Sequence, residues 1–302
     1  MAVVAPVYLI DASVFIFRAY YSIPADMADA QGRPVNALYG FARFLGDLLE
    51  ETRSPLVAVA FDESLTHSYR NQIYPAYKAQ REPAPVELAA QFARCRELCA
   101  HLGLPAFGSD TYEADDIIGT LTARARAAGR PAVVVTRDKD LSQLIRPGDT
   151  FWDFSGGRRY AYDDIAGRFG VRPERMADYL ALTGDAVDNI PGVPGVGPKT
   201  AGVLMTHYAS IDELYANLDA VAALPLRGAA RVQAQLAEHR AAAYLARELT
   251  RIACDVPLPD GEAAVARRRP DLLGLAGFYD AAGFGMALRR QAERLDRHLA
   301  PD

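Results

Sequence analysis

The chain has 302 residues, of which 50% are hydrophobic and 24% charged, a composition typical of globular proteins and not of wholly disordered ones. This length is sufficient for one large domain or two smaller ones, each with its own core. The 33 basic and 38 acidic residues give a formal charge of −5, which taken alone disfavours a nucleic-acid-binding protein.

The first half of the chain contains three apolar runs rich in β-branched residues, each followed by an aspartate. Their continuous apolarity is typical of strands that are buried on both faces of a parallel sheet. Helical patterns over residues 38–51, 88–102 and 114–128 separate them, which predicts an α/β layer fold. Ligands of such sheets bind beyond the carboxyl ends of the strands. The runs are residues 7–10, 56–61 and 132–136, and the aspartates are Asp11, Asp62 and Asp138.

From about residue 163 the pattern is helical. Helices are predicted over residues 176–182, 201–208 and 236–252, with a glycine-rich stretch between the first two. A final segment, residues 272–299, has helical spacing of its apolar residues and is expected to pack back on the body of the protein. The prolines and three consecutive arginines of residues 257–270 indicate a linker or an exposed loop.

Acidic residues recur at the expected ends of strands and helices. Each small group alone is better explained structurally, because acids stabilise the first turn of a helix and aspartates cap turns. Together, so many carboxylates would repel one another unless cations lay between them. Since no histidine accompanies them, Mg²⁺ or Mn²⁺ is favoured over zinc, and two such ions suit phosphodiester hydrolysis. The nine acids are Asp11, Asp62, Glu113, Asp115, Asp116, Asp138, Asp140, Asp185 and Asp188.

Residues 63–85 combine aromatic and basic side chains. This mixture suits single-stranded nucleic acid, which needs aromatic faces for stacking and cations for phosphates. A surface helix with half-buried tyrosines explains it about equally well. Its place directly after Asp62 favours the functional interpretation. The aromatic and basic residues are Tyr69, Arg70, Tyr74, Tyr77, Lys78 and Arg81.

The stretch GVPGVGPKT, residues 192–200, resembles a phosphate-binding loop without being one. Pro198 separates Gly197 from Lys199, no buried strand precedes the stretch, and a dinucleotide fingerprint would need a further glycine. A glycine turn between two helices can instead offer backbone amides and a helix N-terminus to a phosphate, and its carbonyls could hold a monovalent cation. A plain interhelical turn explains the glycines but not Lys199.

Six motifs, in order over residues 7–201, resemble the bacterial 5′-nuclease family, which comprises the 5′→3′ exonuclease domain of DNA polymerase I and stand-alone flap endonucleases. The resemblance implies a PIN-like α/β nuclease core over residues 1–165 with a helical arch at about 63–92. It also implies a helix–hairpin–helix DNA-binding subdomain over 166–260 and a C-terminal helical segment over 261–302. The motifs are LIDASVFIFRAYYS, VAFDESLTHSYR, YPAYKAQR, TYEADDIIGTL, TRDKDLSQL and LTGDAVDNIPGVPGVGPKTA.

The same resemblance implies roles for individual residues. All nine acids fall on the family's metal-site positions. Lys78 and Arg81 match the arch cations that contact the scissile phosphate, and Arg18 matches a basic position near the site. Small departures at Thr111, Arg137 and Thr183 remove no ligand. The residues expected to contact DNA, with potassium at the hairpin, are Arg70, Tyr77, Gly192, Gly195, Gly197, Lys199 and Thr200.

The expected function is therefore that of a Mg²⁺- or Mn²⁺-dependent structure-specific 5′-nuclease with two or more ions, which cuts DNA flaps, nicks or 5′ ends in replication and repair. A catalytically silent DNA-junction binder and a related RNase are the alternatives. Since the N-terminal apolar run meets Asp11 after ten residues, neither a signal peptide nor a membrane span is expected, and the protein is predicted to be a cytoplasmic monomer. Without the nine site acids, the rest of the chain has a basic surplus.

Overall fold

A computed structural model describes residues 4–63 and 68–299. Its centre is a six-stranded sheet in the order β3-β2-β1-β4-β5-β6, in which only β6 is antiparallel to its neighbour. This confirms the predicted mostly parallel α/β core. The strands are β1 (Val7–Asp11), β2 (Val57–Ala60), β3 (Ala106–Phe107), β4 (Ala132–Val135), β5 (Thr150–Asp153) and β6 (Arg158–Ala161).

The sheet register brings the ends of the central strands level with one another. Asp11 at the end of β1 pairs with Ala60 at the end of β2, and Ile10 pairs with Val135 at the end of β4. Every residue of β2 and β4 is buried, which explains their continuous apolarity. The acids that follow these strands are thereby brought to one edge of the sheet.

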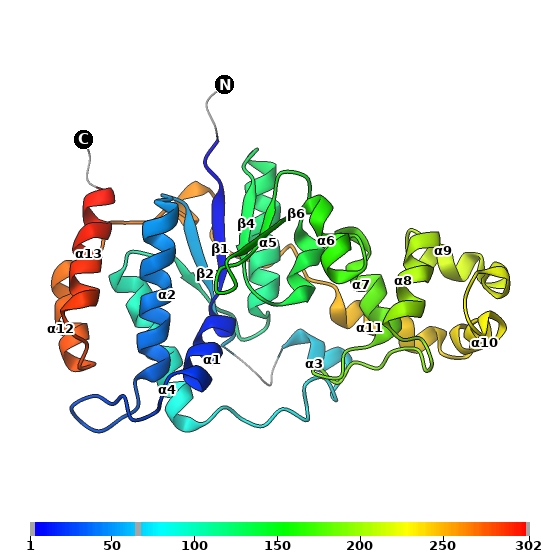
Figure 1. Cartoon of the computed structure of the whole chain (residues 1–302), viewed down its shortest axis with the longest axis horizontal. Coiled ribbons are helices and arrows are strands. Elements are labelled where there is room, and N and C mark those ends of the chain that lie inside the picture. Colours follow the sequence, from blue (N-terminus) through cyan, green and yellow to red (C-terminus); the bar gives the residue numbers. More distant parts are fainter. Residues whose placement is uncertain (1–3, 64–67, 300–302) are drawn as a thin grey trace.

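Helices cover both faces of the sheet (Figure 1). One face packs on α1 (Ala12–Ser22), α2 (Asn36–Thr52), α4 (Val86–His101), α12 (Leu272–Ala281) and α13 (Met286–His298), which share a core with Ile10, Val59 and Val135. The other face packs on α5 (Ala114–Ala127), the 3-10 helix η1 (Lys139–Leu144) and α6 (Tyr162–Phe169).

A second group of helices, at the right of Figure 1, has a core of its own. The chain returns from α11 to the sheet through residues 251–255, which we call the strap. The helices of this group are η2 (Pro173–Arg175), α7 (Met176–Thr183), α8 (Pro198–His207), α9 (Ile211–Ala216), η3 (Leu218–Ala223), α10 (Ala229–Glu238) and α11 (Arg240–Thr250).

One predicted helix is wrong in extent, and the helical C-terminal segment is divided in two. The single helix predicted over residues 236–252 is two helices, α10 and α11, because the backbone at His239 leaves the helical conformation. The segment 272–299 forms α12 and α13, separated at Gly283, whose φ of 68° is in the left-handed region that favours glycine. Within the predicted loop 257–270, only η4 (Glu262–Ala264) is helical.

The predicted helical arch is only partly helical. Residues 64–67 lie outside the described residues. After them come α3 (Tyr69–Ile73) and a run of turns and irregular backbone up to α4. Lys78 has a φ of 55°, a left-handed conformation that no residue of a right-handed helix adopts. In Figure 1 this segment lies beneath the carboxyl ends of the strands.

Within the part of the chain that the structure describes, no helix combines the length and the apolar character that a membrane span requires.

Candidate active site

Acidic side chains gather in one cavity of about 470 Å³ at the carboxyl edge of the sheet. We call it the acid cavity. It brings together residues from the ends of β1, β2 and β4, from the start of α5 and from the loop after α7. Seven of the nine predicted acids line it: Asp11, Asp62, Glu113, Asp115, Asp138, Asp140 and Asp188.

Hydrogen bonds to neighbouring elements fix the innermost acids. Thr136 Oγ1, at the end of β4, donates to Asp11 Oδ2 at 2.8 Å. Asp62 accepts from Ser13 Oγ at 2.9 Å and from the amide of Ala114 at 2.8 Å, so it joins the first turns of α1 and α5. Ser13 and Thr136 were not predicted as site residues; as small hydroxyl residues beside the strand ends, they carry no sequence signal of this role.

The carboxylates of the acid cavity repel one another. Burial, reinforced by the charge of Asp62, raises the pKa of Asp11 to about 7. Burial and the neighbouring Asp138 raise the pKa of Asp140 to about 7 and also raise the pKa of Asp115. The described protein groups therefore leave these carboxylates short of positive charge, and an additional cation would relieve that deficit.

Two acids of the cavity, Glu113 and Asp188, are already paired with basic side chains, Lys78 and Arg81, which we call the basic wall. Lys78 Nζ lies 2.9 Å from Glu113 Oε1 and 3.7 Å from Asp188 Oδ2, and Arg81 forms an ion pair with Asp188. Although burial opposes it, the charges of Lys78 and Arg70 hold the pKa of Glu113 below its usual value. The two predicted phosphate-binding cations thus lie in or at the rim of the acid cavity.

Hydrogen bonds to backbone carbonyls hold residues 76–80 against the loop after α7. The Lys78 amide donates to the carbonyl oxygen of Asp188 at 3.0 Å, and Asn189 Nδ2 donates to the carbonyl oxygen of Ala76 at 2.7 Å. Gln80 Nε2 donates to the carbonyl oxygen of Val187 at 2.9 Å. These bonds hold Lys78 in its left-handed conformation against the acids.

Asp185, one of the nine predicted acids, does not line the acid cavity. Lys139 Nζ lies 2.9 Å from Asp185 and 3.1 Å from Asp140, and despite burial these carboxylates raise the pKa of Lys139. In residues 4–63 and 68–299, no three acidic, histidine or cysteine side chains are arranged to hold a metal ion as they stand. Lys78, Arg81 and Lys139 occupy carboxylates that would otherwise be available.

Asp116 and Arg70 need a different assignment from the predicted one. The Asp116 side chain is fully buried and accepts two hydrogen bonds from Arg70, one from the Glu113 amide and one from the Ala253 amide. Arg70 is only 2% exposed and also donates to the carbonyl oxygen of Leu249. Both side chains are used internally, so we revise the metal-ligand role of Asp116 and the DNA contact of Arg70 to structural roles.

Tyr77 lines the acid cavity but is buried there, and Arg18 lies outside the set of residues that line it. Tyr77 is 3% exposed, and its hydroxyl donates to Glu113 at 3.0 Å, so its ring is not available for stacking on a base. We revise its role to holding Glu113 in place. Arg18 is exposed on α1 and is not among the described residues that line the acid cavity.

The glycine-rich hairpin between α7 and α8 has the predicted position, and its glycines serve different purposes. A Cβ on Gly192 would lie 2.5 Å from the amide nitrogen of Gly184, so this glycine is required by packing inside the hairpin. Gly195 has a φ of 78°, whereas a Cβ on Gly197 would meet open space. Lys199 is exposed in the first turn of α8, next to the half-buried Thr200.

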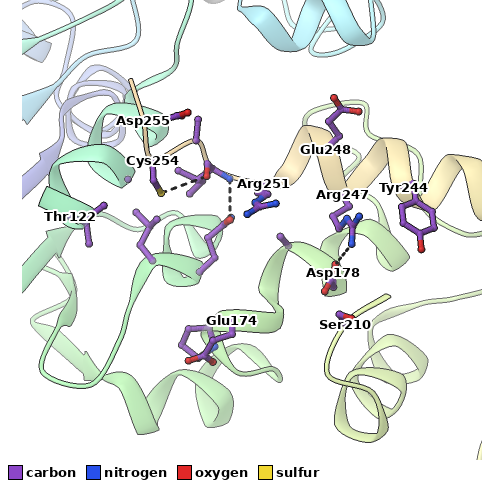
Figure 2. Close-up of a pocket in the computed structure, with 18 of the residues that line it drawn as sticks. Thr122, Glu174, Asp178, Ser210, Tyr244, Arg247, Glu248, Arg251, Cys254 and Asp255 are labelled. Atoms are coloured by element: carbon purple, nitrogen blue, oxygen red, sulfur yellow. Dashed lines mark hydrogen bonds and ion pairs between the residues drawn. The ribbon is translucent and has the colours of Figure 1, made fainter. Parts of the chain in front are cut away.

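A second cavity is larger than the acid cavity. It measures about 1140 Å³ and lies on the other side of the strap, between α5, α7 and α11 (Figure 2). Arg247 and Asp178, 3.9 Å apart, lie on one side of it, and Arg251 and Cys254 come from the strap. Ile252 lines both cavities, so the strap forms part of the wall between them.

Both halves of the chain match domains of one known protein family. Residues 6–170 match the 5′-3′ exonuclease N-terminal resolvase-like domain, and residues 171–272 match the 5′-3′ exonuclease C-terminal SAM fold. This chain belongs to the 5′-3′ exonuclease family. The resemblance read from the sequence motifs is thereby confirmed, as are the PIN-like core and the helical fold expected for the C-terminal part.

Individual relatives agree with this family. The chain is 36% identical over 296 residues to DNA polymerase I of Rhizobium leguminosarum, covering 96% of this chain and 28% of that protein. It is 30% identical over 253 residues to the 5′-3′ exonuclease of Buchnera aphidicola, covering 84% of this chain and 88% of that protein. The chain therefore spans less than a third of the Rhizobium polymerase and most of the Buchnera 5′-3′ exonuclease.

Solved structures share the fold at low sequence identity. T5 5′-exonuclease with bound divalent metal ions (zinc) has a TM-score of 0.64 at 17% identity, covering 96% of this chain and 98% of that chain. The catalytic core of Rad2 in complex with a DNA substrate has a TM-score of 0.62 at 14% identity, covering 96% and 91%.

Proposed function

We propose that this member of the 5′-3′ exonuclease family is a Mg²⁺-dependent, structure-specific 5′-nuclease that cuts DNA near junctions of single strand and duplex in replication and repair. The observation that carries the proposal is the acid cavity, in which carboxylates from the carboxyl edge of the sheet face Lys78 and Arg81. The divalent ions of T5 5′-exonuclease and the DNA substrate of the Rad2 core, in proteins of the same fold, support it.

The donor atoms of the acid cavity suit hard divalent cations. Its described lining offers carboxylate oxygens and neither histidine nor cysteine, which favours Mg²⁺ or Mn²⁺ over zinc. Asp11, Asp62, Asp115, Asp138 and Asp140 would hold two ions together with Glu113 and Asp188, once Lys78 and Arg81 have turned away from the last two and Lys139 from Asp140. When bound, such ions lower the pKa of an attacking water and neutralise the phosphate.

Lys78 and Arg81 would bind the phosphate that is cut. When a phosphodiester enters, Lys78 and Arg81 exchange their carboxylate partners for the non-bridging phosphate oxygens, which frees Glu113 and Asp188. Water adds to phosphorus and the bond to the 3′ oxygen breaks, leaving a 3′-hydroxyl and a 5′-phosphate. The two cations stabilise the negative charge that develops, an effect on the order of 3 kcal/mol for one well-placed group.

The hairpin of residues 192–200 would bind the duplex next to the cut. Its turn offers backbone amides, and the exposed Lys199 adds a charge. A potassium ion bound by turn carbonyls belongs to this proposal. We retain residues 1–165, 166–260 and 261–302 as the proposed parts of the molecule. Monomeric state and cytoplasmic location stay predictions.

A cleavage assay on a 5′-flap duplex with Mg²⁺ tests this function. Cleavage that requires the metal and occurs near the junction is the expected result. A protein that binds the flap and leaves it intact, while a control nuclease cuts it, would be the silent junction binder. Preferential cutting of a matched RNA flap would instead indicate the RNase.

A further inference from the structure

Arg137 is a cation of the acid cavity that the proposed mechanism leaves without a role. It follows Thr136 after β4 and precedes Asp138, and it lines the acid cavity together with Lys78 and Arg81. Its side chain is 52% exposed, compared with 14% for Lys78 and 37% for Arg81. Among the cations that line the acid cavity, it is therefore the most accessible one.

The partners of the other cations show what distinguishes Arg137. Arg70 donates to Asp116, Lys78 pairs with Glu113, and Arg81 pairs with Asp188. Within residues 4–63 and 68–299, the single carboxylate within 4.0 Å of the Arg137 guanidinium is Asp153, 3.6 Å from Nε. No hydrogen bond from its terminal nitrogens is found within that part of the chain.

Asp153 lies beside Nε of the Arg137 guanidinium and does not bind its terminal nitrogens. Asp153 Oδ1 accepts a hydrogen bond from the Gly156 amide at 2.9 Å, which closes the turn between β5 and β6. It thereby faces the Nε side of Arg137 from a fixed position and leaves the terminal nitrogens open. A planar guanidinium held in this way can donate two parallel hydrogen bonds to a phosphate.

We propose that Arg137 binds a backbone phosphate of the nucleic-acid strand that enters the acid cavity, at the rim next to the β5–β6 turn. The proposal rests on the proposed function in one respect, that the substrate is a nucleic acid. A strand would then be bound by Lys78 and Arg81 at the phosphate to be cut and by Arg137 at a neighbouring phosphate.

Salt dependence of binding separates a phosphate contact from a structural role. Binding of a 5′-flap DNA duplex is measured in EDTA, without cleavage, at a series of KCl concentrations. Arg137→Ala and Arg137→Gln should weaken binding roughly tenfold at low salt and reduce the slope of log K against log salt by about one. Arg137→Lys should keep the slope and lose part of the affinity. Asp153→Asn should bind more tightly.

Arg290→Ala provides the control, because this exposed arginine on α13 does not line the acid cavity. It should leave affinity and slope unchanged. An unchanged slope in Arg137→Gln would overturn the proposal. A lower melting temperature beside it would mean that Arg137 only supports the turn between β5 and β6. The Gln variant keeps a donor for Asp153, so it remains measurable if the Ala variant does not fold. With Mg²⁺, wild type that fails to cut would overturn the proposed function, while the slope still decides the role of Arg137.

Discussion

The guanidinium of Arg70 donates hydrogen bonds of 2.7 and 2.8 Å to the two carboxylate oxygens of Asp116. Its other bonds reach the carbonyl oxygens of Leu249 and Arg251, and Asp116 accepts from the amide of Ala253. The pair therefore joins α3, the first turn of α5 and the strap directly behind the acid cavity. The position of the basic wall relative to the acids depends on this buried connection.

Arg70→Met should lower the free energy of unfolding by about 3–5 kcal/mol, because it leaves the charge of Asp116 buried without a partner. Urea denaturation measures the loss. The matched control is Arg269→Met, which breaks a pair of two hydrogen bonds with Asp296 in which the arginine is 56% exposed, and this variant should lose far less stability. Equal losses in the two variants would contradict the structural role assigned to Arg70.

Lys78→Ala should reduce the rate of flap cleavage roughly a hundredfold while changing flap affinity by less than about fivefold. The reason is that Lys78 is deep in the acid cavity and meets the phosphate at the cut, whereas the duplex is held elsewhere. Single-turnover kinetics and equilibrium binding separate the two effects. Gln72→Ala, at an exposed position of α3 that does not line the acid cavity, is the control and should behave like wild type. A Lys78→Ala variant that cuts normally would remove Lys78 from the reaction.

Asp138→Ala should abolish cleavage and retain flap binding. The substitution removes a carboxylate from the lining and adds no bulk, and one negative charge fewer does not repel DNA. Its side chain also accepts a hydrogen bond from the amide of Asp140 at the start of η1, so circular dichroism must show that the fold is kept. Loss of folding and binding together would make Asp138 a structural residue.

Divalent cations should stabilise the folded protein. Burial first, and repulsion between carboxylates second, raises the pKa values of Asp11 and Asp140, and a bound ion would offset both effects. At a hundredfold excess of Mg²⁺ over its Kd, binding to the folded state contributes about 2.7 kcal/mol, which should raise the melting temperature by several degrees. The same ionic strength of NaCl is the control. An identical shift with both salts would indicate screening and not an ion site.

Gly192→Ala should destabilise the hairpin and weaken duplex binding, because a Cβ there would collide with the backbone of Gly184. We expect a loss of about 2–3 kcal/mol in stability, in the range of overpacked sites. Gly277→Ala, on α12 and outside the hairpin, is the matched control, since the same methyl group would point into open space. Thermal melting and affinity for blunt duplex DNA provide the readouts. Tolerance of both substitutions would contradict the packing described.

The strands and acids that meet at the carboxyl edge could be predicted because they depend on local patterns. Continuous apolar runs indicated β1, β2 and β4, and each leads directly to an acid of the acid cavity. β3 could not be found in the same way, since only two of its residues pair with β2. The edge strand β6 is exposed and arginine-rich, so it has no apolar run to detect.

Neighbouring acids in one motif were assigned one role, and the structure separates them. Asp115 and Asp116 are adjacent on α5, where successive residues project about 100° apart. Asp115 consequently faces the acid cavity, while Asp116 faces Arg70. The partner of Asp116 is 46 positions away in the sequence, so no local pattern reveals it. Long-range ion pairs of this kind are what sequence patterns cannot supply.

The acid cavity is proposed to cut DNA next to a junction with the help of divalent ions. A 5′-end-labelled flap duplex, incubated with the protein with and without Mg²⁺ and resolved by length, tests it most directly. We expect one short product released near the junction, with a 3′-hydroxyl end, in the presence of Mg²⁺ and none in EDTA. Product formed equally in EDTA, or no product at any divalent ion concentration with bound flap, would contradict it.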